Sequence, residues 1–183
     1  MTETCCDPAA ITTDPDWLSQ VIIRKITKND LPALEWDGEY RHLRRVYAFS
    51  YQAQASGRVV IWVAELPGAG IIGQIFLQLL SDRLELADGI NRAHIYSFRI
   101  KPPYRSSGLG SLMLKKAETF LKDNAFRCVT LNVAKNNHLA QRLYKRQGYQ
   151  IISHESGRWS FPDDEGVWHD VEEPAWRMQK PLD

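Results

Sequence analysis

A short run of small residues near position 108 has the composition of a phosphate-binding turn. Glycine has no Cβ, so the backbone can approach a ligand closely, and the free N–H groups at a helix start carry a partial positive charge that suits a pyrophosphate. No acidic residue falls in the expected first helical turn. As a bare pattern the run also fits a tight strand-to-helix turn without a ligand. The run reads Arg105-Ser106-Ser107-Gly108-Leu109-Gly110.

The segments around this run alternate between strand and helix patterns, which predicts a mixed sheet with helices on its faces. Strands are expected at 21–26, 58–66, 71–80, 94–100, 127–134, 149–154 and 175–178, with a hairpin turn at 67–70. Helical spacing predicts two helices within 31–54, capped by Asn29 or Asp30 and separated at Gly38. Two further helices are expected at 108–124 and 137–147, the second ending at Gly148.

Length and composition favour one domain, over residues 18–183, after a flexible arm at 1–17. The chain has 183 residues, of which 44% are hydrophobic and 25% charged, enough for a full core. Its formal net charge of +1 indicates neither a nucleic-acid partner nor a membrane surface. No stretch of about 18 apolar residues occurs. We therefore expect a cytoplasmic, unexported protein.

Cysteine and histidine are placed too irregularly for a disulfide framework or a metal site. Cys5 and Cys6 are adjacent and Cys128 stands alone, so paired zinc-type spacing is missing. Four histidines have no second histidine four positions away and no neighbouring cysteine. They are His42, His138, His154 and His169. We expect no metal and a reducing environment.

Two motifs in this order resemble the GNAT superfamily of N-acetyltransferases. The family signature Q/R-x-x-G-x-G/A is similar to Arg105-x-x-Gly108-x-Gly110, which here follows the strand sequence Phe98-Arg99-Ile100-Lys101-Pro102. The family's N-x-x-A-x-x-L-Y helix resembles residues 137–144, and Gly148-Tyr149 follows as in that family. The resemblance covers about residues 21–180 and is most specific over 94–149. It implies an α/β (α+β) fold with a mostly antiparallel sheet, a splayed central strand pair and helices on both faces.

The resemblance also implies acetyl-CoA as cosubstrate, held where the strand ending at Ile100 splays from the strand that begins near Arg127. Backbone groups of Phe98 and Ile100 would pair with the pantetheine arm, and Asn137 would contact the same arm. N–H groups from Ser106 to Ser111 would hold the pyrophosphate. The expected cofactor-binding residues are Phe98, Ile100, Arg105, Ser106, Ser107, Gly108, Leu109, Gly110, Ser111 and Asn137.

Catalysis by this family implies Tyr144 as the general acid that protonates the departing CoA sulfur, with the Phe98 N–H as donor to the acetyl carbonyl. Tyr144 also fits a helix core position. The base is less defined: some relatives carry a glutamate where this chain has His94, which could accept a proton directly or through water. His94 also fits a half-exposed strand end, and an amine that arrives deprotonated needs no base. Tyr96 could orient the amine or a water.

The acceptor is expected to be a primary amine, on a small molecule or a peptide. Six carboxylates form an acidic loop without Lys or Arg between Ser160 and Ala175, which could draw in a cationic amine with Trp168 packed on it, or simply be solvated. A basic cluster at Arg41, Arg44 and Arg45 suggests the opposite charge or an exposed helix face. An acetyl-CoA sensor without robust catalysis, a protein N-terminal or lysine acetyltransferase, and a dimer all stay open. The six acids are Asp163, Asp164, Glu165, Asp170, Glu172 and Glu173.

Overall fold

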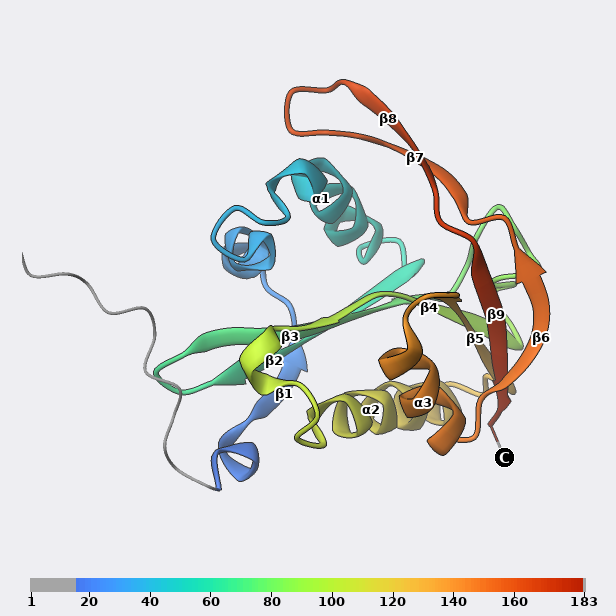
Figure 1. The fold of residues 1–183 in the computed structure, drawn as a ribbon, viewed down its shortest axis with the longest axis horizontal. Coiled ribbons are helices and arrows are strands. Elements are labelled where there is room, and N and C mark those ends of the chain that lie inside the picture. The colour runs from blue at the N-terminus through green and yellow to red at the C-terminus, as the bar shows by residue number, and fades with distance from the viewer. Residues whose placement is uncertain (1–15, 183) are drawn as a thin grey trace, which may run out of the picture.

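The computed structural model describes residues 16–182 and shows a seven-stranded sheet with helices on both faces (Figure 1). The strands lie in the order β1-β2-β3-β4-β5-β9-β6, and only β4 and β5 are parallel neighbours. The expected mixed, mostly antiparallel sheet is therefore confirmed. Its strands are β1 (Ile22–Lys25), β2 (Val59–Leu66), β3 (Gly70–Gln78), β4 (Arg92–Ile100), β5 (Cys128–Ala134), β6 (Gln150–Glu155) and β9 (Ala175–Pro181).

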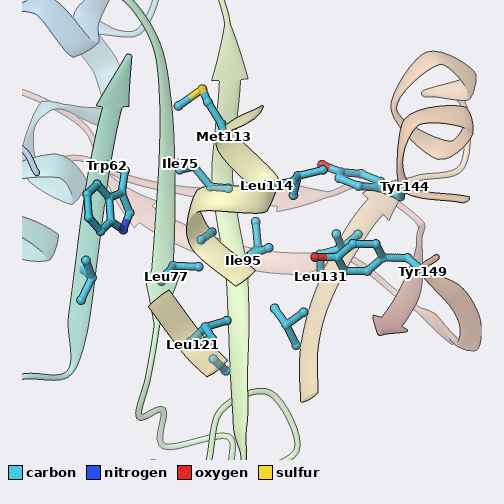
Figure 2. Packing of buried hydrophobic residues seen from close by; sticks show 14 of the residues in the cluster. Trp62, Ile75, Leu77, Ile95, Met113, Leu114, Leu121, Leu131, Tyr144 and Tyr149 are labelled. Carbon is cyan, nitrogen blue, oxygen red and sulfur yellow. The ribbon is translucent and has the colours of Figure 1, made fainter. Parts of the chain in front are cut away.

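Two hydrophobic clusters pack on opposite faces of this sheet. Helix α1 (Arg44–Ala53) and the 3-10 helices η2 (Lys28–Glu35) and η3 (Arg41–Leu43) cover one face. Helices α2 (Leu109–Asp123) and α3 (His138–Arg146) lie against the other. The second cluster is the larger, and Figure 2 shows α2 side chains such as Leu114 and Leu121 packed over Ile75, Leu77 and Ile95. None of the helices within residues 16–182 is long and apolar enough to cross a membrane.

The N-terminal part of the chain corrects two expectations. Of the expected arm, residues 1–15, with Cys5 and Cys6, lie outside the described residues; Trp17 belongs to η1 (Trp17–Gln20) and its ring packs on Tyr104 at 5.2 Å between centroids. The cap of η2 is Thr27, not Asn29 or Asp30. Asp30 instead closes a capping box by accepting the Thr27 N–H at 2.7 Å.

A two-stranded hairpin between β6 and β9 was not expected. β7 (Arg158–Pro162) and β8 (Trp168–Glu172) pair antiparallel where the sequence predicted only an acidic loop. Figure 1 shows this hairpin rising from the β6 and β9 edge of the sheet and arching over α1. Phe161 is buried and joins the cluster beneath α1, so the hairpin is anchored at its far end.

The central parallel pair opens halfway along its length. β4 and β5 pair from Arg92–Cys128 to Ile95–Leu131, after which each strand continues without pairing with the other. A bulge in β4 accompanies the opening: the β3 register shifts between Gln74 and Phe76, and Ser97 has a left-handed φ of 45°. The expected splayed strand pair is thus present, and its apex lies at Ile95.

The base of the hairpin predicts a large cost for one small substitution. Gly157 has a φ of 68°, and a Cβ there would collide with the backbone carbonyl of Glu173, whose N–H bonds the Gly157 oxygen at 3.1 Å. Gly157→Ala should cost about 3 kcal/mol, measured by chemical denaturation. Gly68→Ala is the matched control. Gly68 has a φ of 81°, but a Cβ added there would meet no atom within 4 Å, so the substitution should cost only about 1 kcal/mol. Equal losses would contradict the collision.

Candidate functional site

The open half of β4 presents unpaired backbone groups to the gap. The Lys101 N–H donates to the Ile72 oxygen on β3 at 2.9 Å, and backbone groups alternate in direction along an antiparallel strand. The N–H and C=O of Ile100 therefore point away from β3, toward the gap, and those of Phe98 share that direction. The side chains of both residues approach Gly110 on α2: a Cβ built on Gly110 would lie 3.5 Å from Ile100 and 3.8 Å from Phe98.

The glycine-rich loop ends at the start of α2, beside this gap. Gly108 is the N-cap with a φ of 97°, Ser106 has a φ of 59°, and no side chain bonds to the cap. The first turn of α2 contains no acidic residue. The Leu109 N–H lies 3.5 Å from the Ser107 hydroxyl, and the N–H groups after it stay free at the positive end of the helix dipole, which suits a bound phosphate. A Cβ added at Gly110 would stand 3.1 Å from Leu143 on α3, so the Leu143 side chain would have to shift slightly.

Two polar side chains expected to contact the cofactor have partners within the protein. The Arg105 Nε donates to the Ile100 oxygen at 2.8 Å, so the guanidinium folds over the end of β4. Asn137 caps α3: its Oδ1 accepts the Ala140 N–H at 3.1 Å, which leaves the Asn137 NH₂ group free to donate. Their contacts with a cofactor stay predictions.

Tyr144 lies at the inner edge of the gap, on the α2 side. Its side chain is only 7% exposed, its ring centroid is 6.5 Å from that of Phe98, and Figure 2 shows its hydroxyl directed toward Leu114. Burial raises the pKa of Tyr144 above its usual value of 10. Its hydroxyl makes no hydrogen bond with any residue from 16 to 182. Neighbouring Tyr149 differs, because its hydroxyl donates to Glu118 at 3.0 Å.

His94 lies in the paired half of β4 and is not the half-exposed strand end that the sequence suggested. It is 6% exposed, and its Nδ1 lies 2.8 Å from the Thr130 hydroxyl. That hydroxyl also has two carbonyl oxygens in reach, Leu86 at 3.1 Å and Ala93 at 3.3 Å. When it donates to one of them it accepts from the Nδ1–H of His94, and in that tautomer Nε2 carries the lone pair. Burial, with Arg177 and Arg83 nearby, lowers the pKa of His94 from 6.5 to about 3.

The face of the sheet under α1 carries a cavity beside Tyr96. The Tyr96 hydroxyl donates to the Ser50 hydroxyl at 3.2 Å, and burial raises the pKa of Tyr96 to about 12. The cavity has a volume of about 580 Å³ and lies between α1, the start of β2 and the end of β3. Phe49, Ser50, Arg58, Gln78, Arg83 and Tyr96 are among its lining residues.

The acidic loop has cationic partners, contrary to the local sequence. Asp164 accepts from Arg41 at 2.7 Å, Glu172 pairs with Arg158 at 3.3 Å, and Asp163 lies 2.7 Å from His169. The basic cluster is likewise divided, because Arg41 precedes α1 and Arg44 pairs with Glu35. Three of the six carboxylates therefore fasten the hairpin to η3 or to itself.

The structure adds residues that the sequence did not single out. Arg99, two positions after the bulge residue Ser97, extends to the α1 face and donates to the Tyr47 hydroxyl at 2.9 Å. Its guanidinium stacks over the Tyr40 ring at 4.4 Å. Alternation along β4 places Arg99 opposite to Phe98 and Ile100, and that period-two pattern was the only sequence signal for it.

The neutral state of His94 predicts a loss of stability in acid. The folded-state pKa lies below the unfolded value, so the unfolded chain binds more protons and stability falls as the pH drops below about 6.5. Between pH 7 and 4.5 the loss should be about 2–3 kcal/mol by chemical denaturation. His94→Asn keeps a donor near Nδ1 and should lose less over this range. Parallel losses in both proteins would show that His94 does not titrate in this way.

Known proteins resemble this chain in sequence and in fold. A family model described as the acetyltransferase (GNAT) family matches residues 24–149. A Bacillus subtilis (strain 168) protein, named provisionally as a [ribosomal protein bS18]-alanine N-acetyltransferase, is 40% identical over 58 residues, which cover 32% of this chain and 38% of that protein. The match thus spans less than half of that relative's length.

Two solved structures share the fold over most of their length. The ribosomal-protein-S18-alanine N-acetyltransferase from Escherichia coli aligns with a TM-score of 0.65 and 19% identity, covering 88% of this chain and 94% of that one. A spermidine N-acetyltransferase from Vibrio cholerae in complex with CoA and spermine aligns with a TM-score of 0.64 and 17% identity, covering 90% and 96%. Because the family model matches more than half of the sequence, this chain belongs to the GNAT acetyltransferase family.

Proposed function

We propose that the protein is an N-acetyltransferase that moves the acetyl group of acetyl-CoA to a primary amine, by direct attack within a ternary complex. The observation that carries this proposal is the open half of the β4–β5 pair next to the capless start of α2. One feature offers backbone partners for an amide-containing arm and the other offers N–H groups for a pyrophosphate.

The residues present fit such a cofactor. In the proposal, the backbone groups of Phe98 and Ile100 pair with the pantetheine arm as an added strand would. The N–H groups from Ser106 to Ser111 surround the pyrophosphate, and the free NH₂ of Asn137 donates to the arm. The Ile100 oxygen has two lone pairs, so its bond from Arg105 leaves one for the ligand.

The transfer needs a donor to the carbonyl oxygen, a proton for the sulfur and an acceptor for the proton of the amine. The amine nitrogen forms a bond to the acetyl carbon, the C–S bond breaks, the nitrogen loses one proton and the sulfur gains one. The Phe98 N–H, which points into the gap, would donate to the carbonyl oxygen as negative charge develops on it. Tyr144 would supply the proton to sulfur, because its raised pKa keeps the phenol protonated at neutral pH and its hydroxyl has no other described partner.

The proton from the amine has two routes. His94 has a free lone pair on Nε2, but its lowered pKa makes it a weak base, so it serves best through a water. The second route is an amine that binds already deprotonated. Because burial makes His94 a weak base, this second route is favoured. Tyr96, half-buried on the acceptor side, would orient the amine or that water.

The proposed chemistry applies to more than one class of amine acceptor. Relatives are named for a ribosomal protein alanine and for spermidine, so both peptide N-termini and small amines fall within the proposal. A second candidate, an acetyl-CoA sensor, is favoured by the absence of a carboxylate at position 94. Free CoA thiol released with a panel of amines and peptides distinguishes the two. A cytoplasmic location belongs to the proposal and rests on the cysteine pattern.

Acetyl-CoA should stabilise the fold through the start of α2. At about 100 times its dissociation constant it should add about 2.7 kcal/mol to the folded state and raise the melting midpoint. Gly110→Asp should abolish the shift, because a carboxylate would stand where the pyrophosphate lies. Gly110→Ala adds the same Cβ, at 3.1 Å from Leu143, without the charge, and so measures the steric part alone. A folded Gly110→Asp protein that binds acetyl-CoA normally would contradict the assignment.

Tyr144→Phe should lower kcat by about 10- to 10⁴-fold while acetyl-CoA affinity and the melting midpoint barely change, because only a hydroxyl without a described partner is removed. Steady-state kinetics with a good acceptor is the measurement. Tyr149→Phe is the matched control: it removes the bond to Glu118 and should lower stability but not kcat. Unchanged kcat in Tyr144→Phe would leave Tyr144 as a core residue.

A further inference from the structure

We propose that the acceptor carries a carboxylate beside its amine, and that Arg99 binds this carboxylate. This inference rests on the proposed function and narrows its acceptor class. It also replaces the expectation that the acidic loop and Trp168 draw in a purely cationic amine.

Arg99 is held in place yet has no counter-charge. The Tyr47 hydroxyl fixes one end of the guanidinium at 2.9 Å and the Tyr40 ring lies under it at 4.4 Å. Within residues 16–182 no carboxylate oxygen comes within 4.0 Å of it. Its Nε and Nη2 make no hydrogen bond there either. A stacked, half-buried guanidinium with free donors matches the two oxygens of a carboxylate.

Nearby charges leave this site cationic. The acids on the hairpin closest to α1 are occupied, since Asp164 pairs with Arg41 and Asp163 with His169. Glu35, on η2, is held by two bonds from Arg44 at 2.7 and 2.8 Å. Glu39 lies beside the Tyr40 hydroxyl, but neither it nor the paired acids form an ion pair with Arg99 within residues 16–182. An anion is therefore the ligand charge that this face favours.

Arg99 also stands at the right place for an acceptor. Phe98 and Ile100 turn their side chains to α2, and Arg99 between them turns to α1. An amine that attacks a carbonyl held at the Phe98 N–H from the α1 side would thus have Arg99 next to its substituents. The bulge at Ser97 brings these opposite directions together within a few residues.

The hairpin supplies an aromatic wall for the same face. Cross-strand pairs share a face, so Trp159 and Val171 lie with Phe161 and His169, whereas Trp168 pairs with Pro162 on the other face. The first face packs toward α1, where Phe161 and Val171 join the buried cluster. Trp159 stacks on Phe161 at 5.0 Å and keeps 44% of its surface exposed. Trp168, 69% exposed, lies on the outer side of the hairpin.

An unbroken line of rings joins this wall to Arg99. Phe161 lies 5.7 Å from His42, and His42 lies 6.2 Å from Tyr40, the ring under the guanidinium. Trp159 stands at the far end of this line, four successive contacts from Arg99, so only an extended acceptor such as a peptide would reach it. The geometry therefore favours an acceptor with a carboxylate at one end and an apolar or aromatic part next to it.

The test compares acceptors that differ only in the carboxylate. Phenylalanine, phenylalaninamide and phenethylamine form one series, and peptides that begin Met-Asp or Met-Asn form another, so a free amino acid is distinguished from an acidic peptide N-terminus. Wild-type kcat/KM should favour the carboxylate member of at least one series by about 10- to 100-fold. Equal values in both series, or a preference for spermidine over all of them, would overturn the proposal.

Variants then assign the preference to Arg99. Arg99→Gln should raise KM for the carboxylate acceptor by about 10- to 100-fold and collapse its advantage over the amide, with acetyl-CoA affinity unchanged. Arg99→Lys keeps the positive charge but loses the two parallel N–H donors of the guanidinium, so its KM for the carboxylate acceptor should lie between those of the wild type and Arg99→Gln. Lys122→Gln removes a cation from the last turn of α2, on the other face of the sheet, and should leave the preference intact. A preference that survives Arg99→Gln, or an altered acetyl-CoA affinity instead, would refute the assignment.

These outcomes separate the inference from the function on which it rests. If no amine releases CoA thiol while acetyl-CoA still raises the melting midpoint, the transferase proposal fails and the sensor remains. If amines react regardless of their carboxylate, the transferase proposal stands and only the role of Arg99 fails.

Discussion

The separation of β4 from β5 beyond Ile95 is the constraint on which the rest of the structure depends. Two parallel strands that continued to pair would satisfy each other's backbone groups and leave no site. The extra residue in β4, with Ser97 in a left-handed conformation, turns the strand away from β5 while its pairing with β3 resumes at Arg99. β5 stays paired with β9 to its last residue, Ala134. Both strands are thus held firmly on their outer sides and open on their inner sides.

That opening divides the work between the two faces of the sheet. On one face, α2 and α3 bring a helix start, Gly110 and Tyr144 against the gap. On the other, α1 and the hairpin bring Arg99, Tyr96 and Trp159. Because side chains alternate along β4, one short segment serves both faces at once. Buried Phe161 anchors the hairpin on the second face, and the exposed ion pair between Arg41 and Asp164 joins the hairpin to η3 across 123 positions of sequence.

The sequence predicted the parts of the site that depend on local backbone geometry. Gly108 and Gly110 indicate a helix start that a ligand can approach, and Gly108 does adopt the positive φ that makes glycine the suitable residue there. The conformation of Ser97 could not be predicted, because serine carries no such signal and the bulge is visible only in the register of β4 against β3. The hairpin was missed because its acids read as a solvated loop, although residues 158–162 and 168–172 have strand-like alternation. The partners of those acids lie on η3 and within the hairpin, which only the tertiary fold brings together.

Tyr144 on α3 and Tyr149 just after it are neighbouring buried phenols whose hydroxyls have different surroundings. Their rings are 5.7 Å apart and both are buried, so burial raises the pKa of each. Tyr149 places its hydroxyl on Glu118, which Lys180 also holds at 2.6 Å, and this fixed network ties α2 to β9. Tyr144 has the same burial without such a partner. The Tyr144 hydroxyl keeps some access to solvent, and it makes no hydrogen bond within the described chain. A group kept in that state beside an open strand gap is suited to a ligand atom that arrives there, and the proposed sulfur of CoA would be such an atom.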